Sequence, residues 1–141
     1  MGSRLVVLWA DLDLGARTVA GEARGLPLAG QVAVACAMVN RAIARHRGEL
    51  HIAGVVLEPL QFSCWNAGDP NRDVICDLSA ADRVYRTALQ AFLSALDLAG
   101  TPADPTRAAT HYWHESIPVP AWARGAPVLA RIDGHAFVRV A

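Results

Sequence analysis

The sequence predicts an α+β fold in which helices dominate and a small C-terminal β-hairpin or sheet follows them. Helix-type patterns occupy three stretches between residues 11 and 96. Four prolines between residues 101 and 125 rule out a long helix there. Two β-type runs in residues 128–140 are joined by Asp133-Gly134, a strong hairpin signal. Helices first and strands last define the class, and the length predicts one domain, residues 1–141.

The first two predicted helices flank a short Gly-rich tract. Asp11 is placed to cap a helix that runs to about residue 20. Two glycines then interrupt the helical pattern on either side of Glu22. Pro27 suits the first turn of a second helix over about residues 28–45. The small and branched apolar side chains of this second helix predict nearly complete burial.

The middle of the chain is predicted to alternate loops with helix. Residues 51–65 carry apolar runs broken by glycine and proline, so we expect a short helical turn and then a loop. The tract "NAGDPNRD", residues 66–73, is predicted to be a surface loop because its residue types favour turns. Ser79 and Asp82 resemble a capping box, and the apolar spacing behind them predicts a helix that ends near residue 100.

Charge and hydropathy exclude several kinds of partner. The chain has 13 basic residues, all of them Arg, and 13 acidic residues, and no broad cationic stripe, so we expect no nucleic-acid partner. Mean hydropathy is +0.25, yet the longest apolar run, residues 32–39, is too short to span a bilayer. We therefore expect no stable membrane insertion. The opening residues lack a clear cleavage site, so no signal peptide is predicted.

Three cysteines form no metal-type or redox-type pair. Cys36 lies in an apolar helical stretch and is predicted to be a core residue. Spacing leaves open whether Cys64 and Cys76 form a disulfide.

Glu22 is the first candidate for chemistry. Cleavage of a glycosidic bond needs a protonated carboxylic acid at the leaving oxygen, and burial among apolar groups raises a carboxyl pKa toward that state. No second carboxylate lies in a recognisable motif, although glycosidases usually use two. One acid suffices if a hydroxyl or N-acetyl group of the substrate attacks, which indicates an amino-sugar polymer. A surface Glu22 paired with Arg24 or Arg17 is the structural alternative.

The tract "QFSCW", residues 61–65, combines an amide, aromatic rings, a hydroxyl and a thiol. Such groups suit a sugar-binding cleft, and its candidates are Gln61, Phe62, Ser63 and Trp65. The alternative makes Phe62 and Trp65 core anchors. A second enzyme class stays open in which Cys64 is a nucleophile with His111 or His114 as its base.

The tract "THYWHES", residues 110–116, adds groups that hydrogen-bond or stack. Tyr112, His114 and, further on, Trp122 are predicted to line the cleft, although packing would also explain the tryptophan. His111 and His114 have a spacing that allows metal ligation, but no second ligand pair accompanies them. No metal site and no cofactor are predicted.

Four tracts resemble, in order, those of the SleB-like cell wall hydrolases, the spore-cortex-lytic type. They are "ARTVAGEARGLPLAGQVAVACAMVNR", "VVLEPLQFSCW", "DPTRAATHYWH" and "PAWARG…IDGHAFVR". The resemblance covers about residues 12–139. It implies a helical core similar to that of lysozyme-like lytic transglycosylases, with a small β-element added.

The resemblance also implies an activity on the glycan strand of peptidoglycan. Cleavage would fall between N-acetylmuramic acid and N-acetylglucosamine and, by lytic transglycosylase action, leave a 1,6-anhydromuramyl end. Muramidase-type hydrolysis of the same bond is the alternative. The Glu of the family's "GEARGE" tract falls on Glu22, which would be the general acid and then the base.

The chain departs from the family pattern at several positions. Leu26 replaces the last Glu of "GEARGE", and Arg107 and Ala108 replace two glycines of "DPTGGA". The family's "HYHN" is "HYWH" here, so Tyr112 corresponds directly and His114 only loosely. These changes fall on the expected cleft walls.

A compact catalytic unit with no appended wall-binding module and no predicted signal peptide suits a phage endolysin or a phage-like particle protein. We expect a monomeric phage or phage-like endolysin, made in the cytoplasm and acting on wall peptidoglycan in the envelope, delivered by a holin or a virion component. A Cys-dependent wall amidase or peptidase and a non-catalytic wall-binding protein are the other classes.

Overall fold

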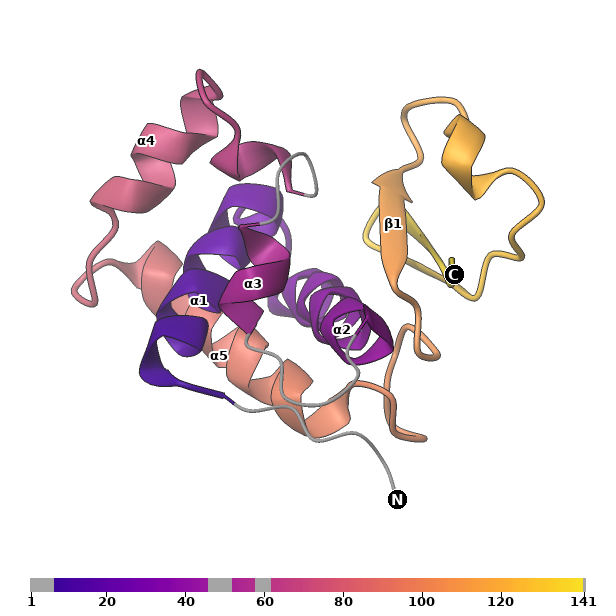
Figure 1. The fold of residues 1–141 in the computed structure, drawn as a ribbon, viewed down its shortest axis with the longest axis horizontal. Coiled ribbons are helices and arrows are strands. Elements are labelled where there is room, and N and C mark those ends of the chain that lie inside the picture. The colour runs from indigo at the N-terminus through magenta and orange to yellow at the C-terminus, as the bar shows by residue number, and fades with distance from the viewer. Residues whose placement is uncertain (1–6, 46–51, 58–61, 141) are drawn as a thin grey trace.

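The computed structural model describes residues 7–45, 52–57 and 62–140, in which a group of helices lies beside a small sheet (Figure 1). The helices are α1 (Trp9–Ala23), α2 (Leu28–Arg45), α3 (Ile52–Val56), α4 (Pro70–Asp77) and α5 (Arg83–Leu98), with 3₁₀ turns η1 (Ser63–Trp65) and η2 (Ala121–Ala123). The strands are β1 (His111–His114), β2 (Ala130–Ile132) and β3 (His135–Val138). The predicted helix-dominated α+β class is confirmed. No helix among the described residues is long and apolar enough to cross a membrane.

Small side chains bring the three long helices close together. Both α1 and α2 pack against α5, and their contacts are rich in fully buried alanines, among them Ala16, Ala20, Ala88 and Ala91. A Cβ added at Gly15 would lie 2.5 Å from the ring of Phe92, so that position admits no side chain. The core is therefore built by close helix approach around a few large residues.

The sheet attaches to the helices through α2. Its order is β1-β3-β2, both pairs are antiparallel, and Tyr112 lies opposite Phe137. Phe137 is buried in a cluster with apolar residues of α2. The hairpin turn at Asp133 and Gly134 has φ values of 47° and 83°, as the two-residue turn requires, which confirms that prediction.

The first helix is longer than predicted and its cap is different. α1 continues through Glu22 to Ala23, so Gly21 does not break it, whereas Gly25 follows its end. Asp11 lies inside the first turn, where its Oδ2 accepts a hydrogen bond from the Leu8 amide at 2.7 Å. Its Oδ1 accepts another from the Ala53 amide at 2.8 Å, which ties α1 to α3. The second helix, α2, has the predicted bounds.

Three further elements differ from the predictions. The stretch predicted as a surface loop begins α4, because Pro70 fits a first turn and Asp69 caps it by accepting from the Asn71 amide at 2.8 Å. The third long helix, α5, begins at Arg83, since the Asp82 carboxylate closes the preceding turn onto the Ser79 amide at 2.7 Å. The proline-rich stretch contains the strand β1, which was not predicted.

The segment that leads into β1 is organised by one buried carboxylate. Asp104 accepts hydrogen bonds from the Asn40 amide group at 2.8 Å, the Gly100 amide at 2.9 Å and both the amide and hydroxyl of Thr106. These donors hold the pKa of Asp104 below its ordinary value, although burial alone would raise it. Asp104 thereby fixes the path that brings β1 beside α2.

Candidate active site

Glu22 lies in the last turn of α1, at an open pocket of about 330 Å³. The other residues that line the pocket are Gly21, Ala23, Arg24, Gly25 and Asn71. All but one come from the end of α1, and Asn71 comes from the first turn of α4. The Glu22 side chain is half-buried, so a substrate can approach it from one side.

The glycine before Glu22 is needed for packing. A Cβ at Gly21 would lie 2.7 Å from Cβ and 2.8 Å from Sγ of Cys64, so only glycine lets η1 lie against α1 here. Trp65, at the other end of η1, donates from Nε1 to the Thr18 hydroxyl at 2.8 Å. The "SCW" turn is thus fixed on α1 beside the carboxylate.

Burial raises the pKa of the Glu22 carboxyl above its ordinary value. Hydrogen-bonding interactions with the Tyr112 hydroxyl and the Cys64 thiol, and the charge of Arg41, oppose that rise, while the charge of Asp69 adds to it. Burial wins, so Glu22 keeps its proton to a higher pH than an exposed Glu. A protonated acid at the mouth of an open pocket is suited to proton donation.

Tyr112 brings the sheet into this site. It lies on β1, and its ring packs against Phe137 with centroids 5.7 Å apart. Burial, followed by the charge of Glu22, raises the pKa of the Tyr112 hydroxyl well above its ordinary value. The phenol therefore remains a hydrogen-bond donor toward Glu22 whichever charge state the carboxyl takes.

The predicted cleft residues divide between the site and other places. Phe62 is 3 % exposed and lies under the Arg41 guanidinium, 4.6 Å from its ring centroid, so it is a core residue. Trp65 is partly buried and anchors η1, whereas Ser63 is exposed at the start of that turn. Gln61 lies outside the described residues.

His114 is the last residue of β1, and Trp122 lies in η2. His114 is exposed and bonds through Nδ1 to the Ser116 hydroxyl at 2.6 Å. Trp122 is 48 % exposed and lies against the His111 ring, with centroids 5.4 Å apart. Neither lines the pocket that holds Glu22, so their part in binding stays a prediction.

Sequence reasoning did not single out His135. It is buried on β3 between the rings of Tyr112 and His114, at centroid distances of 5.5 and 5.1 Å. Burial lowers the pKa of His135, so its ring is neutral where an exposed histidine would begin to charge. The register of the antiparallel strands β1 and β3, which pairs His114 with His135, would have been needed to place His135 beside Tyr112, and the local sequence does not give it.

All three thiols are free in the structure. Cys36 is buried in the core, as predicted, and Cys76 is exposed. Cys64 is buried beside Glu22, and burial together with the charge of Glu22 raises its thiol pKa. A nucleophilic thiolate needs a lowered pKa and a basic partner, and here the neighbour is an acid. Among the described residues no three His, Cys, Asp or Glu side chains form a metal-binding group.

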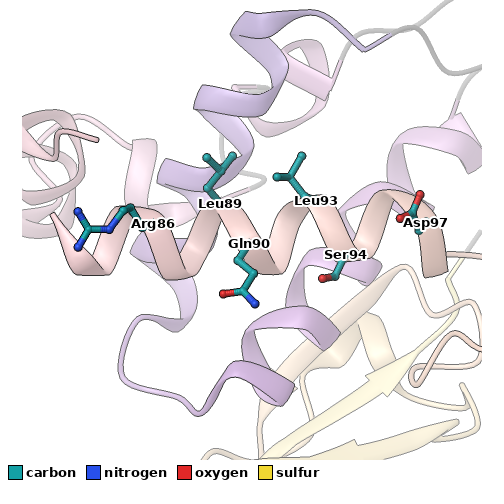
Figure 2. Close-up of a pocket in the computed structure, with 6 residues that line it drawn as sticks. All are labelled: Arg86, Leu89, Gln90, Leu93, Ser94 and Asp97. Carbon is teal, nitrogen blue, oxygen red and sulfur yellow. The ribbon is translucent and has the colours of Figure 1, made fainter. Parts of the chain in front are cut away.

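A second hollow, of about 350 Å³, lies along α5 and shares no residue with the first. Figure 2 shows its six side chains spaced from Arg86 at one end of the helix to Asp97 at the other. Leu93 is 44 % exposed there, and no buried acid faces the hollow. Its chemistry gives no reason to place a reaction at this surface.

Comparison with known proteins gives the class to which this helical core and hairpin belong, that of the enzymes that degrade the bacterial cell wall. The chain belongs to the cell wall hydrolase family, whose profile matches residues 25–138. Glu22 lies just before the first matched residue.

Curated relatives are spore cortex-lytic enzymes. That of Halalkalibacterium halodurans is 33 % identical over 127 residues, which is 90 % of this chain and 34 % of the relative. That of Bacillus subtilis is 32 % identical over 127 residues, 90 % of this chain and 37 % of the relative. The chain thus spans about a third of the length of these relatives.

Two solved structures share the fold over nearly their full length. The catalytic domain of the Bacillus cereus SleB protein has a TM-score of 0.73 and 30 % identity, covering 95 % of this chain and 93 % of that one. The catalytic domain of the germination-specific lytic transglycosylase SleB from Bacillus anthracis has a TM-score of 0.70 and 30 % identity, covering 94 % and 96 %.

Proposed function

We propose that the protein cleaves the glycan strand of peptidoglycan between N-acetylmuramic acid and N-acetylglucosamine, as a lytic transglycosylase with Glu22 as its acid and base. The observation that carries the proposal is the half-buried Glu22, with its pKa raised, at an open pocket. The similarity to a domain described as a lytic transglycosylase supports the reaction type.

The first step is proton donation. The protonated Glu22 gives its proton to the glycosidic oxygen while the bond between that oxygen and C1 of the muramyl residue breaks. N-Acetylglucosamine leaves with a new hydroxyl, and Glu22 becomes a carboxylate. Interactions with the Tyr112 hydroxyl and the Cys64 thiol stabilise this charge as it forms.

The second step closes the muramyl ring. The C6 hydroxyl oxygen bonds to C1, and its proton passes to the Glu22 carboxylate, which restores the acid for the next cycle. No water is consumed, and the product carries a 1,6-anhydro end. One carboxylate serves both steps, so the proposal needs no second acid of the kind that glycosidases usually carry.

Fragment release from purified sacculi tests the role of Glu22. The Glu22→Gln variant should lose about a hundredfold to ten-thousandfold of the rate, because a neutral amide cannot donate the proton. Glu115→Gln is the matched control, since Glu115 is an exposed carboxylate paired with Arg131 at 3.2 Å. Equal rates for Glu22→Gln and the wild type would overturn the assignment.

Delivery to the wall is a separate part of the proposal. We propose that the enzyme acts as a phage or phage-like endolysin, a monomer that reaches the wall through a holin or a virion component. Expression of the protein in the cytoplasm with and without a holin tests this route. We expect the cells to lyse only when the holin is expressed together with the protein. Lysis that needs no holin would contradict this route.

A further inference from the structure

The rim of the Glu22 pocket carries one guanidinium. Arg24 lies just beyond the end of α1, is exposed, and donates from Nη2 to the Asn71 side-chain oxygen at 2.7 Å. Its Nη1 donates to the Ala20 carbonyl at 3.2 Å. Arg24 makes no ion pair with any described residue, and no other cation lines this pocket. A positioned guanidinium therefore faces the pocket with its charge unneutralised.

The other side of the pocket, formed by Asn71 on α4, is fixed by bonds between α1 and α4. Arg17 on α1 donates from Nη1 to the Ile75 carbonyl at 2.6 Å and to the Leu78 carbonyl at 2.8 Å, at the end of α4. The Asp69 cap fixes the beginning of α4, where Asn71 lies. Arg24 is thus held on α1, and Asn71 belongs to α4, which is itself bonded to α1. The pair is therefore positioned before a ligand binds.

Gly25 leaves the backbone at the edge of the pocket uncovered. A Cβ at this position would meet nothing within 4 Å, and its φ lies outside the left-handed region. Neither packing nor backbone conformation therefore requires glycine here, unlike at Gly21. The missing side chain leaves the backbone at the pocket open to close approach by another molecule.

We propose that Arg24 and Asn71 form a subsite for a carboxylate on the muramyl side of the scissile bond. The inference rests on the proposed function, since it takes peptidoglycan as the ligand. The N-acetylated sugars of the strand are neutral, and the acids nearest the bond are the carboxyls of the peptide stem or, on a muramyl residue without a stem, its free lactyl carboxyl. A guanidinium with an amide beside it binds a carboxylate through paired hydrogen bonds.

Binding, measured separately from cleavage, tests this subsite. Co-sedimentation with purified sacculi is measured for the full chain carrying Glu22→Gln, with and without Arg24→Gln. The second change should weaken binding about tenfold on native sacculi. Sacculi whose carboxyls are capped as amides should bind the Arg24 protein about tenfold more weakly, and the Arg24→Gln protein should show no further loss.

Matched variants separate binding from folding. Arg86→Gln is the control, because Arg86 is an exposed arginine on α5 that lines the other hollow and donates to the carbonyls of Ala80 and Ala81. It should bind native and capped sacculi as its parent does. Gly25→Leu should weaken binding without lowering the melting temperature, since open space surrounds that position.

The source of the carboxylate is read from peptide-free strands. Stripping the stems with an amidase also frees the lactyl carboxyls, so an effect of Arg24→Gln that persists on stripped strands shows that the subsite takes the lactyl carboxylate. If it disappears, the ligand is a carboxylate of the peptide stem. Equal binding of native sacculi with and without Arg24→Gln would overturn the subsite. It would also be overturned if Arg24→Gln weakened binding while the protein with Arg24 intact bound native and amide-capped sacculi equally well. Failure of the cleavage proposal would show instead in the release assay.

Discussion

Two regions of the molecule meet at Glu22, and they are built by different forces. The bundle of α1, α2 and α5 is held by apolar packing of small side chains around Phe92. The segment from residue 100 to β1 is held by polar bonds that converge on Asp104. Packing therefore places the acid, and a hydrogen-bonded loop places its neighbour Tyr112. The geometry around Glu22 therefore depends on apolar packing and on buried hydrogen bonds together.

Breaking the bundle should have the largest effect. Phe92 is fully buried and its ring fills the space left by Gly15, so Phe92→Ala should lower the free energy of unfolding by about 3–5 kcal/mol. Urea unfolding followed by circular dichroism measures it. Leu93→Ala on the exposed side of the same helix is the control and should change stability far less.

Removing the Asp104 carboxylate, which organises the segment from residue 100 to β1, should have the second-largest effect on stability. Asp104→Ala leaves its buried donors without an acceptor and should lower stability by about 2–4 kcal/mol near pH 7. Because the folded-state pKa of Asp104 is lowered, its contribution is present above the unfolded-state pKa and is lost as pH falls through the folded-state pKa. The difference in the free energy of unfolding between Asp104→Ala and the wild type should thus become smaller below about pH 4. A constant gap would contradict the role of the charge.

Relieving strain in the loop should have a smaller, opposite effect. Ala108 and Arg107 adopt positive φ values of 64° and 56°, which disfavour any residue but glycine. The family resemblance has glycines at both positions. Ala108→Gly should therefore stabilise the protein by about 1 kcal/mol, visible as a higher melting temperature. Ala109→Gly, at a buried neighbour with an ordinary φ, should not stabilise it.

Removing the thiol beside the acid should give the smallest effect, a shift of the pH profile. The interaction with Cys64 lowers the pKa of Glu22, so Cys64→Ala should raise that pKa and move the alkaline limb of the activity profile to higher pH. Cys64→Ser keeps a donor and should stay close to the wild type. Loss of activity at every pH in Cys64→Ser would favour thiol chemistry instead.

Features set by local sequence could be predicted, whereas features set by contacts between distant residues could not. Helical periodicity and a turn dipeptide predicted α2, α5 and the hairpin, because each signal is local. The short tract around Glu22 singled it out as a candidate, yet the continuation of α1 through Gly21 was missed, since the reason for that glycine is a contact with Cys64. The strand β1 and the neighbours of Tyr112 depend on pairings between distant residues, which no local pattern carries.

The structure places the predicted cleft residues in different surroundings. Tyr112 lies beside Glu22, whereas Phe62 belongs to the core and Trp65 serves as an anchor. Aromatic side chains are equally useful in cores and in sugar clefts, so residue type could not separate the two uses. Arg24, whose place at the rim depends on α4, could not be recognised before the fold was known.

Mass spectrometry of the fragments that wild-type protein and Glu22→Gln release from purified sacculi tests whether Glu22 catalyses lytic transglycosylation. We expect muropeptides with 1,6-anhydromuramyl ends from the wild type and none from the variant. Reducing muramyl ends would keep Glu22 as the acid but replace the proposed second step by hydrolysis. Anhydro products at an undiminished rate from Glu22→Gln, or freed peptides with intact glycan, would contradict the account.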